Sequence, residues 1–131
     1  MSHVHAVVWL DHREAKVIDY SIDDKHVVNV RHTGGHRQVH HRAGATGSGH
    51  AADDGHFFDA IVAALDDARE VLVTGPGTAK AGFREHVAKR HHALAGRIVG
   101  IETLDHPSEG ELLAFARKYF KRVDNLLGDQ R

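Results

Sequence analysis

The residues with the greatest potential for chemistry lie between Lys25 and Ala52, a stretch that contains no aspartate or glutamate. It holds one lysine, three arginines and six of the chain's fourteen histidines: Lys25, His26, Arg31, His32, His36, Arg37, His40, His41, Arg42 and His50. Histidine titrates near pH 6.5, so the positive charge of this stretch should rise just below neutrality. Basic side chains neutralise phosphates and histidine rings stack on bases, which makes RNA contact one interpretation.

The segment 33–51 is predicted to be a long flexible loop. It is rich in glycine and has almost no large apolar residue, so it cannot contribute to a core. Loops longer than about 12–15 residues in a compact domain are usually functional or disordered. Glycine also lets backbone amides approach a nucleic-acid backbone closely. A solvated polar loop has the same composition, so the pattern alone leaves that interpretation open.

Metal binding is another interpretation of the loop histidines, because imidazole is a ligand for zinc, nickel and copper. His36, His40 and His41 are close in sequence, but no nearby carboxylate or cysteine completes a recognisable ligand set. The sequence therefore predicts no bound metal and no other cofactor, with these three histidines as weak candidates. A His-rich metal-binding or stress-response module stays open as an alternative function.

A glycine-rich turn follows the apolar run 71–74 and reads Gly-Pro-Gly-Thr-Ala-Lys over residues 75–80. It does not match the phosphate-binding pattern G-x-x-x-x-G-K-[ST], because alanine follows its lysine. We interpret it as a structural turn from strand to helix, in which glycine supplies backbone torsions that other residues avoid. Its residues are Gly75, Pro76, Gly77 and Lys80.

Acidic residues near strand ends suggest a third kind of site. Asp11 follows the first apolar run, with Glu14 close by, and Asp105 follows the last run. A metal-dependent nuclease needs several carboxylates that converge on two divalent ions, whereas aspartate is also common in turns. The sequence has no Gly-x-Ser-x-Gly elbow and no Cys–His pair, so covalent catalysis has no candidate. We therefore assign no catalytic residue.

The elements that must position these residues alternate in a regular order. Three short apolar runs joined by tight turns predict an antiparallel meander, with the most apolar first run at the centre. Apolar residues at helical spacing then alternate with two further strands, which predicts parallel crossovers. The order β-β-β-α-β-α-β-α indicates an α/β fold with a mixed five-stranded sheet covered by helices. The predicted strands are 5–10, 15–20, 26–31, 70–74 and 97–103, and the predicted helices are 53–69, 80–91 and 109–123.

The whole chain of 131 residues, 41% of them hydrophobic, suits one domain over 1–124 with a polar tail over 125–131. A net charge of −1 excludes a broadly basic protein. There is no run of 18 apolar residues for a membrane span, and the first residues lack the pattern of a signal peptide. The absence of cysteine excludes disulfides and thiolate sites and favours a reducing cytoplasm.

Three stretches resemble one protein family: His41-Arg42-Ala43-Gly44 in the loop, residues 71–83 around Gly-Pro-Gly, and residues 101–112. Their order is similar to the middle domain of the eukaryotic and archaeal peptide-chain release factors and of their ribosome-rescue relative Pelota. Short bacterial proteins described as translational machinery proteins are similar too. The resemblance covers nearly the whole chain. It implies a ribonuclease H-like fold and a task on the ribosome.

The resemblance ends within the loop. In release factors Arg-Ala-Gly continues into Gly-Gln, whose glutamine helps to place the water that hydrolyses peptidyl-tRNA. Here Ala45-Thr46-Gly47 follow, and neither Ala45 nor Thr46 offers an amide. The comparison therefore implies binding without catalysis. Hydrolysis of peptidyl-tRNA, with Thr46 or a loop histidine positioning water, is the alternative. We expect no counterpart of the family's stop-codon-reading and GTPase-binding domains in these residues.

The sequence thus predicts a bacterial, cytoplasmic protein that binds the ribosome or tRNA and no membrane. Arginines would contact phosphates, glycines would permit close approach and histidines would add contacts that depend on pH. The chain could act alone, pair with itself or use separate protein partners. The predicted RNA-binding residues are Arg31, Arg37, His40, His41, Arg42, Ala43, Gly44, Thr46, Gly47, Gly49 and His50.

Overall fold

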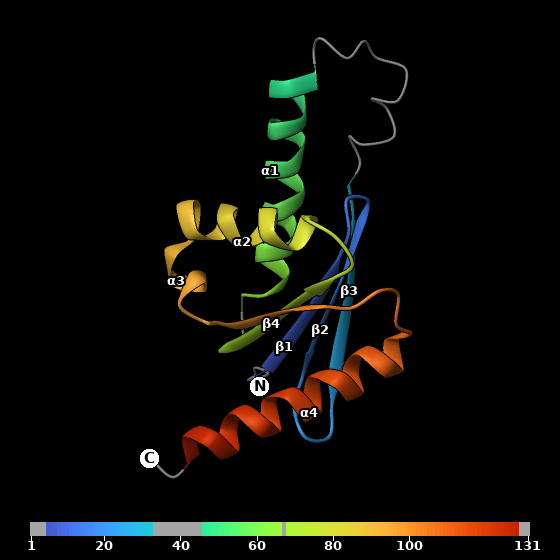
Figure 1. Cartoon of the computed structure of the whole chain (residues 1–131), viewed down its shortest axis with the longest axis vertical. Helices are drawn as coiled ribbons and strands as arrows, with labels where there is room; N and C mark the ends of the chain where they lie inside the picture. The colour runs from blue at the N-terminus through green and yellow to red at the C-terminus, as the bar shows by residue number, and fades with distance from the viewer. Residues whose placement is uncertain (1–4, 33–45, 67, 129–131) are drawn as a thin grey trace.

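Five strands form one mixed sheet in the computed structural model of the chain (Figure 1). The structure describes residues 5–32, 46–66 and 68–128, with the backbone alone described for 46–53 and 124–128. The strands are β1 His5–Leu10, β2 Glu14–Tyr20, β3 Lys25–Arg31, β4 Glu70–Gly75 and β5 Ile98–Thr103. The helices are α1 Thr46–Ala64, α2 Ala79–Arg90, α3 His92–Ala95 and α4 Glu109–Gly128.

Strand β1 is central, as its apolar sequence predicted, and the order across the sheet is β3-β2-β1-β4-β5. The meander β1-β2-β3 is antiparallel, whereas β4 pairs parallel with β1 and with β5. The predicted mixed five-stranded α/β sheet is therefore confirmed. Strands β1, β3, β4 and β5 all run in one direction, so their carboxyl ends meet at one end of the sheet.

Helices cover both faces of the sheet and give it two cores. One core lies under α1, α2 and α3, where the apolar stripe predicted for the first helix is buried. The other lies under α4. Because side chains of a strand alternate between faces, β1 contributes Val8 and Leu10 to the first core and Val7 and Trp9 to the second. The residues of β1 from Ala6 to Leu10 are consequently all buried.

The helix ends differ from the predicted ends. Helix α1 begins at Thr46 and not at Asp53 or Asp54, because each residue added to a formed helix gains a hydrogen bond without a second nucleation. Helix α4 runs to Gly128, so most of the predicted tail is helical. The helix predicted over 80–91 ends at Arg90 and is followed by the short α3. In the described residues no helix combines the length and apolar character needed to cross a membrane.

The start of α4 is a capping box, with Ser108 at the N-cap and Glu111 three residues later. The Ser108 N–H donates to Glu111 Oε1 at 2.8 Å, and the Glu111 N–H donates to Ser108 Oγ at 3.1 Å. In the same turn Glu109 Oε2 accepts a hydrogen bond from Lys25 Nζ at 3.0 Å. That bond and the charge of Lys25 lower the pKa of the Glu109 carboxyl from its ordinary value. The first turn of α4 is thereby tied to the start of β3.

Gly75 ends β4 where the backbones of β4 and β1 come very close. A Cβ on Gly75 would overlap the backbone carbonyl oxygen of Leu10, whereas a Cβ on Gly77 would have no atom within 4 Å. The prediction that these glycines supply unusual torsions is wrong, because no described glycine has a positive φ. What Gly75 provides is room for two strands to approach.

Replacing Gly75 with alanine should therefore destabilise the protein, while the same change at Gly77 should not. Overpacking against a rigid backbone costs about 1–3 kcal/mol, and the Leu10 carbonyl belongs to the central strand. Urea denaturation of Gly75→Ala and Gly77→Ala, followed by circular dichroism, measures both free energies of unfolding. Equal values for the two variants would contradict this explanation.

Candidate nucleic-acid interface

The loop predicted to contact RNA leaves the sheet after β3 and ends where α1 begins. Several predicted residues lie outside the described ranges: His36, Arg37, His40, His41, Arg42, Ala43 and Gly44. Four others belong to the first turns of α1, where the structure describes the backbone: Thr46, Gly47, Gly49 and His50. Figure 1 shows the N-terminal half of α1 projecting beyond the sheet and the other helices. The helix therefore carries one end of the loop away from the body of the domain.

Strand β3 divides the acid-free stretch between opposite ends of the sheet. At its start Lys25 pairs with Glu109, and His26 Nδ1 lies 3.4 Å from Asp19 Oδ1. At its end Arg31 is exposed. Seven residues of strand span about 20 Å, so the first two basic residues lie far from Arg31, at the opposite end of the sheet. The start of the acid-free stretch is therefore paired with acidic residues from other parts of the chain.

His32 is the last described residue before the loop, and it is buried with 7% of its surface exposed. Its Nε2 lies 2.7 Å from Asp54 Oδ1, and its ring centroid lies 4.9 Å from that of Phe57. Both partners belong to α1. His32 belongs to the acid-free stretch but precedes the predicted loop, and Val28, Val30 and His32 alternate as residues of one strand face do. That alternation was the signal that it points inward.

The turn between β1 and β2 places two more basic residues at the end of the sheet where the loop begins. His12 and Arg13 are exposed. The carbonyl oxygen of Arg13 accepts the His32 N–H at 2.9 Å, and His12 Nε2 lies 3.3 Å from Thr78 Oγ1. Neither was predicted as a site residue. The predicted meander held the signal, since the β1–β2 turn and the end of β3 must be neighbours, which brings Arg13 beside His32.

Lys80 follows the turn after β4, and its Nζ donates to the carbonyl oxygen of Gly77 at 2.6 Å. This bond suits the structural role predicted for the turn. We call the four basic residues at this end of the sheet the basic rim: His12, Arg13, Arg31 and Lys80. The rim is not purely basic, because Glu14 stands opposite Arg31 in the β2–β3 ladder.

The acidic residues considered for a nuclease lie at the same end of the sheet but make other contacts. Asp11 Oδ1 accepts the backbone N–H of Arg13 at 2.8 Å and of Glu14 at 2.9 Å, which closes the β1–β2 turn. Asp105 Oδ1 lies 3.0 Å from His106 Nδ1, and Asp11 Oδ2 lies 3.9 Å from Nε2 of the same ring. Within the described ranges these acids do not share a group with metal-ligating spacing. The His106 ring therefore stands between these two carboxylates.

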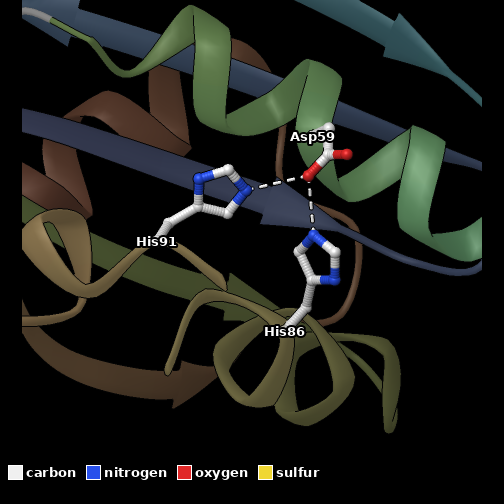
Figure 2. Close-up of side chains that lie close together, drawn as sticks. All are labelled: Asp59, His86 and His91. Atoms are coloured by element: carbon white, nitrogen blue, oxygen red, sulfur yellow. Dashed lines mark hydrogen bonds and ion pairs between the residues drawn. The ribbon is translucent and has the colours of Figure 1, made fainter. Parts of the chain in front are cut away.

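One group of described residues does have metal-ligating spacing: Asp59 of α1, His86 of α2 and His91 (Figure 2). Asp59 Oδ1 lies 2.7 Å from His86 Nε2 and 2.8 Å from His91 Nε2. The hydrogen bonds from His86 and then from His91 lower the pKa of the Asp59 carboxyl from its ordinary value. Sequence analysis missed this group, because the two histidines lie 27 and 32 positions after the aspartate.

Comparison with known proteins relates the fold, but not the sequence, to known families. No protein-family model and no curated protein matches this sequence. Among solved structures, Archaeoglobus fulgidus Pelota superposes with a TM-score of 0.63 over 95% of this chain, at 16% identity. Dom34 of S. cerevisiae gives 0.56 over 96% of this chain at 14% identity, and the archaeal translation termination factor aRF1 gives 0.52 over 96% at 13% identity.

This chain therefore has the fold of a domain of Pelota, Dom34 and aRF1, as the sequence resemblance predicted. It is the ribonuclease H-like mixed sheet with helices on both faces. The chain spans 33% of the length of the Pelota structure, 36% of Dom34 and 39% of aRF1. The similarity is thus one of a single domain with part of each larger protein.

Replacing His32 with alanine should lower the free energy of unfolding by about 1–3 kcal/mol, because a buried hydrogen bond and a ring contact are lost together. His56 is an exposed histidine of α1, so His56→Ala is the matched control and should change the value little. Urea denaturation measures both. Equal effects of the two substitutions would show that His32 does not fix the end of β3 to α1.

Proposed function

We propose that this chain is a translation-factor-like protein that associates with the ribosome or tRNA in the cytoplasm and binds RNA through residues 31–50. The observation that carries the proposal is the origin of the loop. An acid-free sequence leaves the sheet beside the basic rim, and His32 fixes that origin to α1. Release, rescue or regulation of translation are the roles that such binding would serve.

The fold supports a role in translation. The solved neighbour aRF1 is an archaeal translation termination factor, and Dom34 is a translation termination-like factor involved in RNA quality control that interacts with Hbs1. By analogy we propose that this chain, too, works with separate protein partners. The shared element is the fold, and loops carried by a folded scaffold are common sites of function.

Charge geometry supports binding through the loop and the rim rather than through the whole surface. The net charge is −1, so nonspecific attraction to RNA is weak. The basic residues at the far end of β3 pair with acids, as described above for Lys25 and His26. At the end of the sheet from which the loop leaves, Arg13 and Arg31 are exposed and could contact phosphates together with the loop.

We infer binding without catalysis, because the chemistry implied by the family resemblance lacks its key group. The loop keeps Arg42-Ala43-Gly44 but continues with Ala45 and Thr46 in place of glycine and glutamine. A methyl group and a hydroxyl cannot reproduce a side-chain amide that donates and accepts at once. Residues 42–44, which match the family motif, thus suit positioning against RNA, and residues 45 and 46 do not suit water activation.

Removing three loop arginines should weaken ribosome binding. We expect the triple variant Arg31→Ala/Arg37→Ala/Arg42→Ala to bind at least tenfold more weakly and to show a salt slope shallower by about 2, because three phosphate contacts are lost. Co-sedimentation with ribosomes over a series of salt concentrations measures both quantities.

The matched control removes three positive charges from the opposite face of the sheet. Lys118, Lys121 and Arg122 are exposed on α4, and their triple alanine variant should bind ribosomes like the unaltered protein. Equal losses in the two triple variants would mean that net charge alone governs binding. Unchanged binding in the loop variant would remove the loop from the proposed function.

Peptidyl-tRNA hydrolysis is the competing function. A release assay on programmed ribosomes should show no hydrolysis above buffer for the unaltered chain, since the amide that positions water is missing. The Thr46→Val variant serves as the matched comparison, because it removes the hydroxyl while keeping the side-chain shape. Release by the unaltered chain that disappears in Thr46→Val would establish catalysis in place of simple binding.

A further inference from the structure

Asp59, His86 and His91 bring three ligand-type atoms together at the junction of α1 with the end of α2 (Figure 2). We propose that they form a binding site for a divalent transition-metal ion of the Zn²⁺ type. Imidazole nitrogen and carboxylate oxygen are donors that Zn²⁺ takes in proteins. The three atoms all lie within 4.8 Å of one another. This inference is independent of the proposed RNA binding.

The directions of the side chains suit a common ligand. Figure 2 shows both imidazole rings pointing Nε2 at the same oxygen of Asp59, and the two ring centroids lie 5.4 Å apart. When each ring carries its proton on Nδ1, the Nε2 lone pairs converge on the space beside that oxygen. An ion placed there receives two nitrogens and one oxygen without any change in the course of the backbone.

The two N–O distances require only a small adjustment. Zinc lies about 2.0–2.2 Å from nitrogen and oxygen ligands, so neighbouring ligand atoms of a tetrahedral site are about 3.3 Å apart. The two N–O distances are 2.7 and 2.8 Å, and the carboxylate must therefore retreat by roughly half an ångström. The Asp59 side chain is 51% exposed, which leaves it free to rotate toward solvent and make that room.

The two imidazoles are held in place before any ion arrives. The His86 side chain is 13% exposed, and its ring centroid lies 5.4 Å from that of Phe58 on α1. Gly55, one turn earlier on α1, lies beside the same ring, since a Cβ there would be in ordinary contact with His86 at 3.8 Å. His91 sits at the end of α2, where its N–H donates to the Val87 carbonyl oxygen at 2.8 Å. Ligands ordered in this way lose little conformational freedom on binding.

Three protein ligands leave one tetrahedral position for water. The half-exposed Asp59 puts that position on the solvent side of the cluster. An ion bound there would join α1, the helix that follows the loop, to the C-terminal end of α2. Because the ion binds the folded chain and the ligands separate on unfolding, binding should raise thermal stability.

Hydrogen bonds without an ion would also hold these side chains at the same distances. In that case each Nε2 carries a proton and donates to the carboxylate. A hydrogen-bonded cluster and a metal site respond differently to added zinc. Because the chain has fourteen histidines, the choice of variants is decisive. Loop histidines must therefore be altered separately from the cluster.

Calorimetric titration of the full chain with zinc chloride tests the site. We expect one equivalent of Zn²⁺ to bind to the unaltered protein and to the loop variant His36→Gln/His40→Gln/His41→Gln. In Asp59→Asn and in His86→Gln/His91→Gln the affinity of that equivalent should fall at least a hundredfold. Zinc should raise the thermal midpoint of the first two proteins and leave that of the cluster variants unchanged.

Cobalt chloride gives a second readout, because tetrahedral Co²⁺ with nitrogen and oxygen ligands absorbs strongly in the visible range. These bands should appear with the unaltered chain and the loop variant and be absent from the cluster variants. Asp59→Asn alters one exposed side chain. It therefore tests the metal site even if the double histidine variant does not fold. Binding only at millimolar zinc, or binding that is lost in the loop variant and kept in Asp59→Asn, would overturn the proposal.

Discussion

Strand β1 is hydrogen-bonded to a strand on each side and buried on both faces. The rest of the structure depends on this constraint. Each fully buried aliphatic side chain stabilises the fold by roughly 1.5–3 kcal/mol, and β1 supplies such side chains to both cores. Polar groups reinforce the same strand. The buried Thr74 donates its hydroxyl to the Val8 carbonyl oxygen at 2.8 Å, and Trp9 Nε1 donates to the Asp105 carbonyl oxygen at 2.9 Å. A side chain at Gly75 would push these partners apart.

A rigid sheet end is a suitable base for a long binding segment. Strands β1, β3 and β4 end together there, and their turns are closed by bonds within the protein, such as those of Asp11 and Lys80. His32 closes the last gap by joining β3 to α1. A loop that starts from such a base can carry polar and glycine-rich sequence without weakening the cores, because no apolar side chain is withdrawn from them.

Histidine richness in this chain does not correspond to one function. His32 is a buried link between a strand and a helix, whereas His86 and His91 share one carboxylate on the other side of α1. His106 stands between Asp11 and Asp105 at the end of the sheet. Each ring has an aspartate partner, and the partner determines what the imidazole can do. Composition alone cannot distinguish these cases, since the partners come from distant parts of the chain.

The sequence by itself determined the order of the elements, the central place of β1, the buried stripe of α1 and the cap of α4, because these follow from the spacing of neighbouring residues. Helix ends were predicted less well, since Thr46 and Gly128 are reached by extending a helix that contacts elsewhere already stabilise. Only the tertiary structure decided which charges share a surface. Strand pairing placed Glu14 opposite Arg31 and Lys25 at the far end of the sheet, and helix packing brought Asp59 to His86. Such contacts join residues that are distant along the chain, and no local pattern of residue types encodes them.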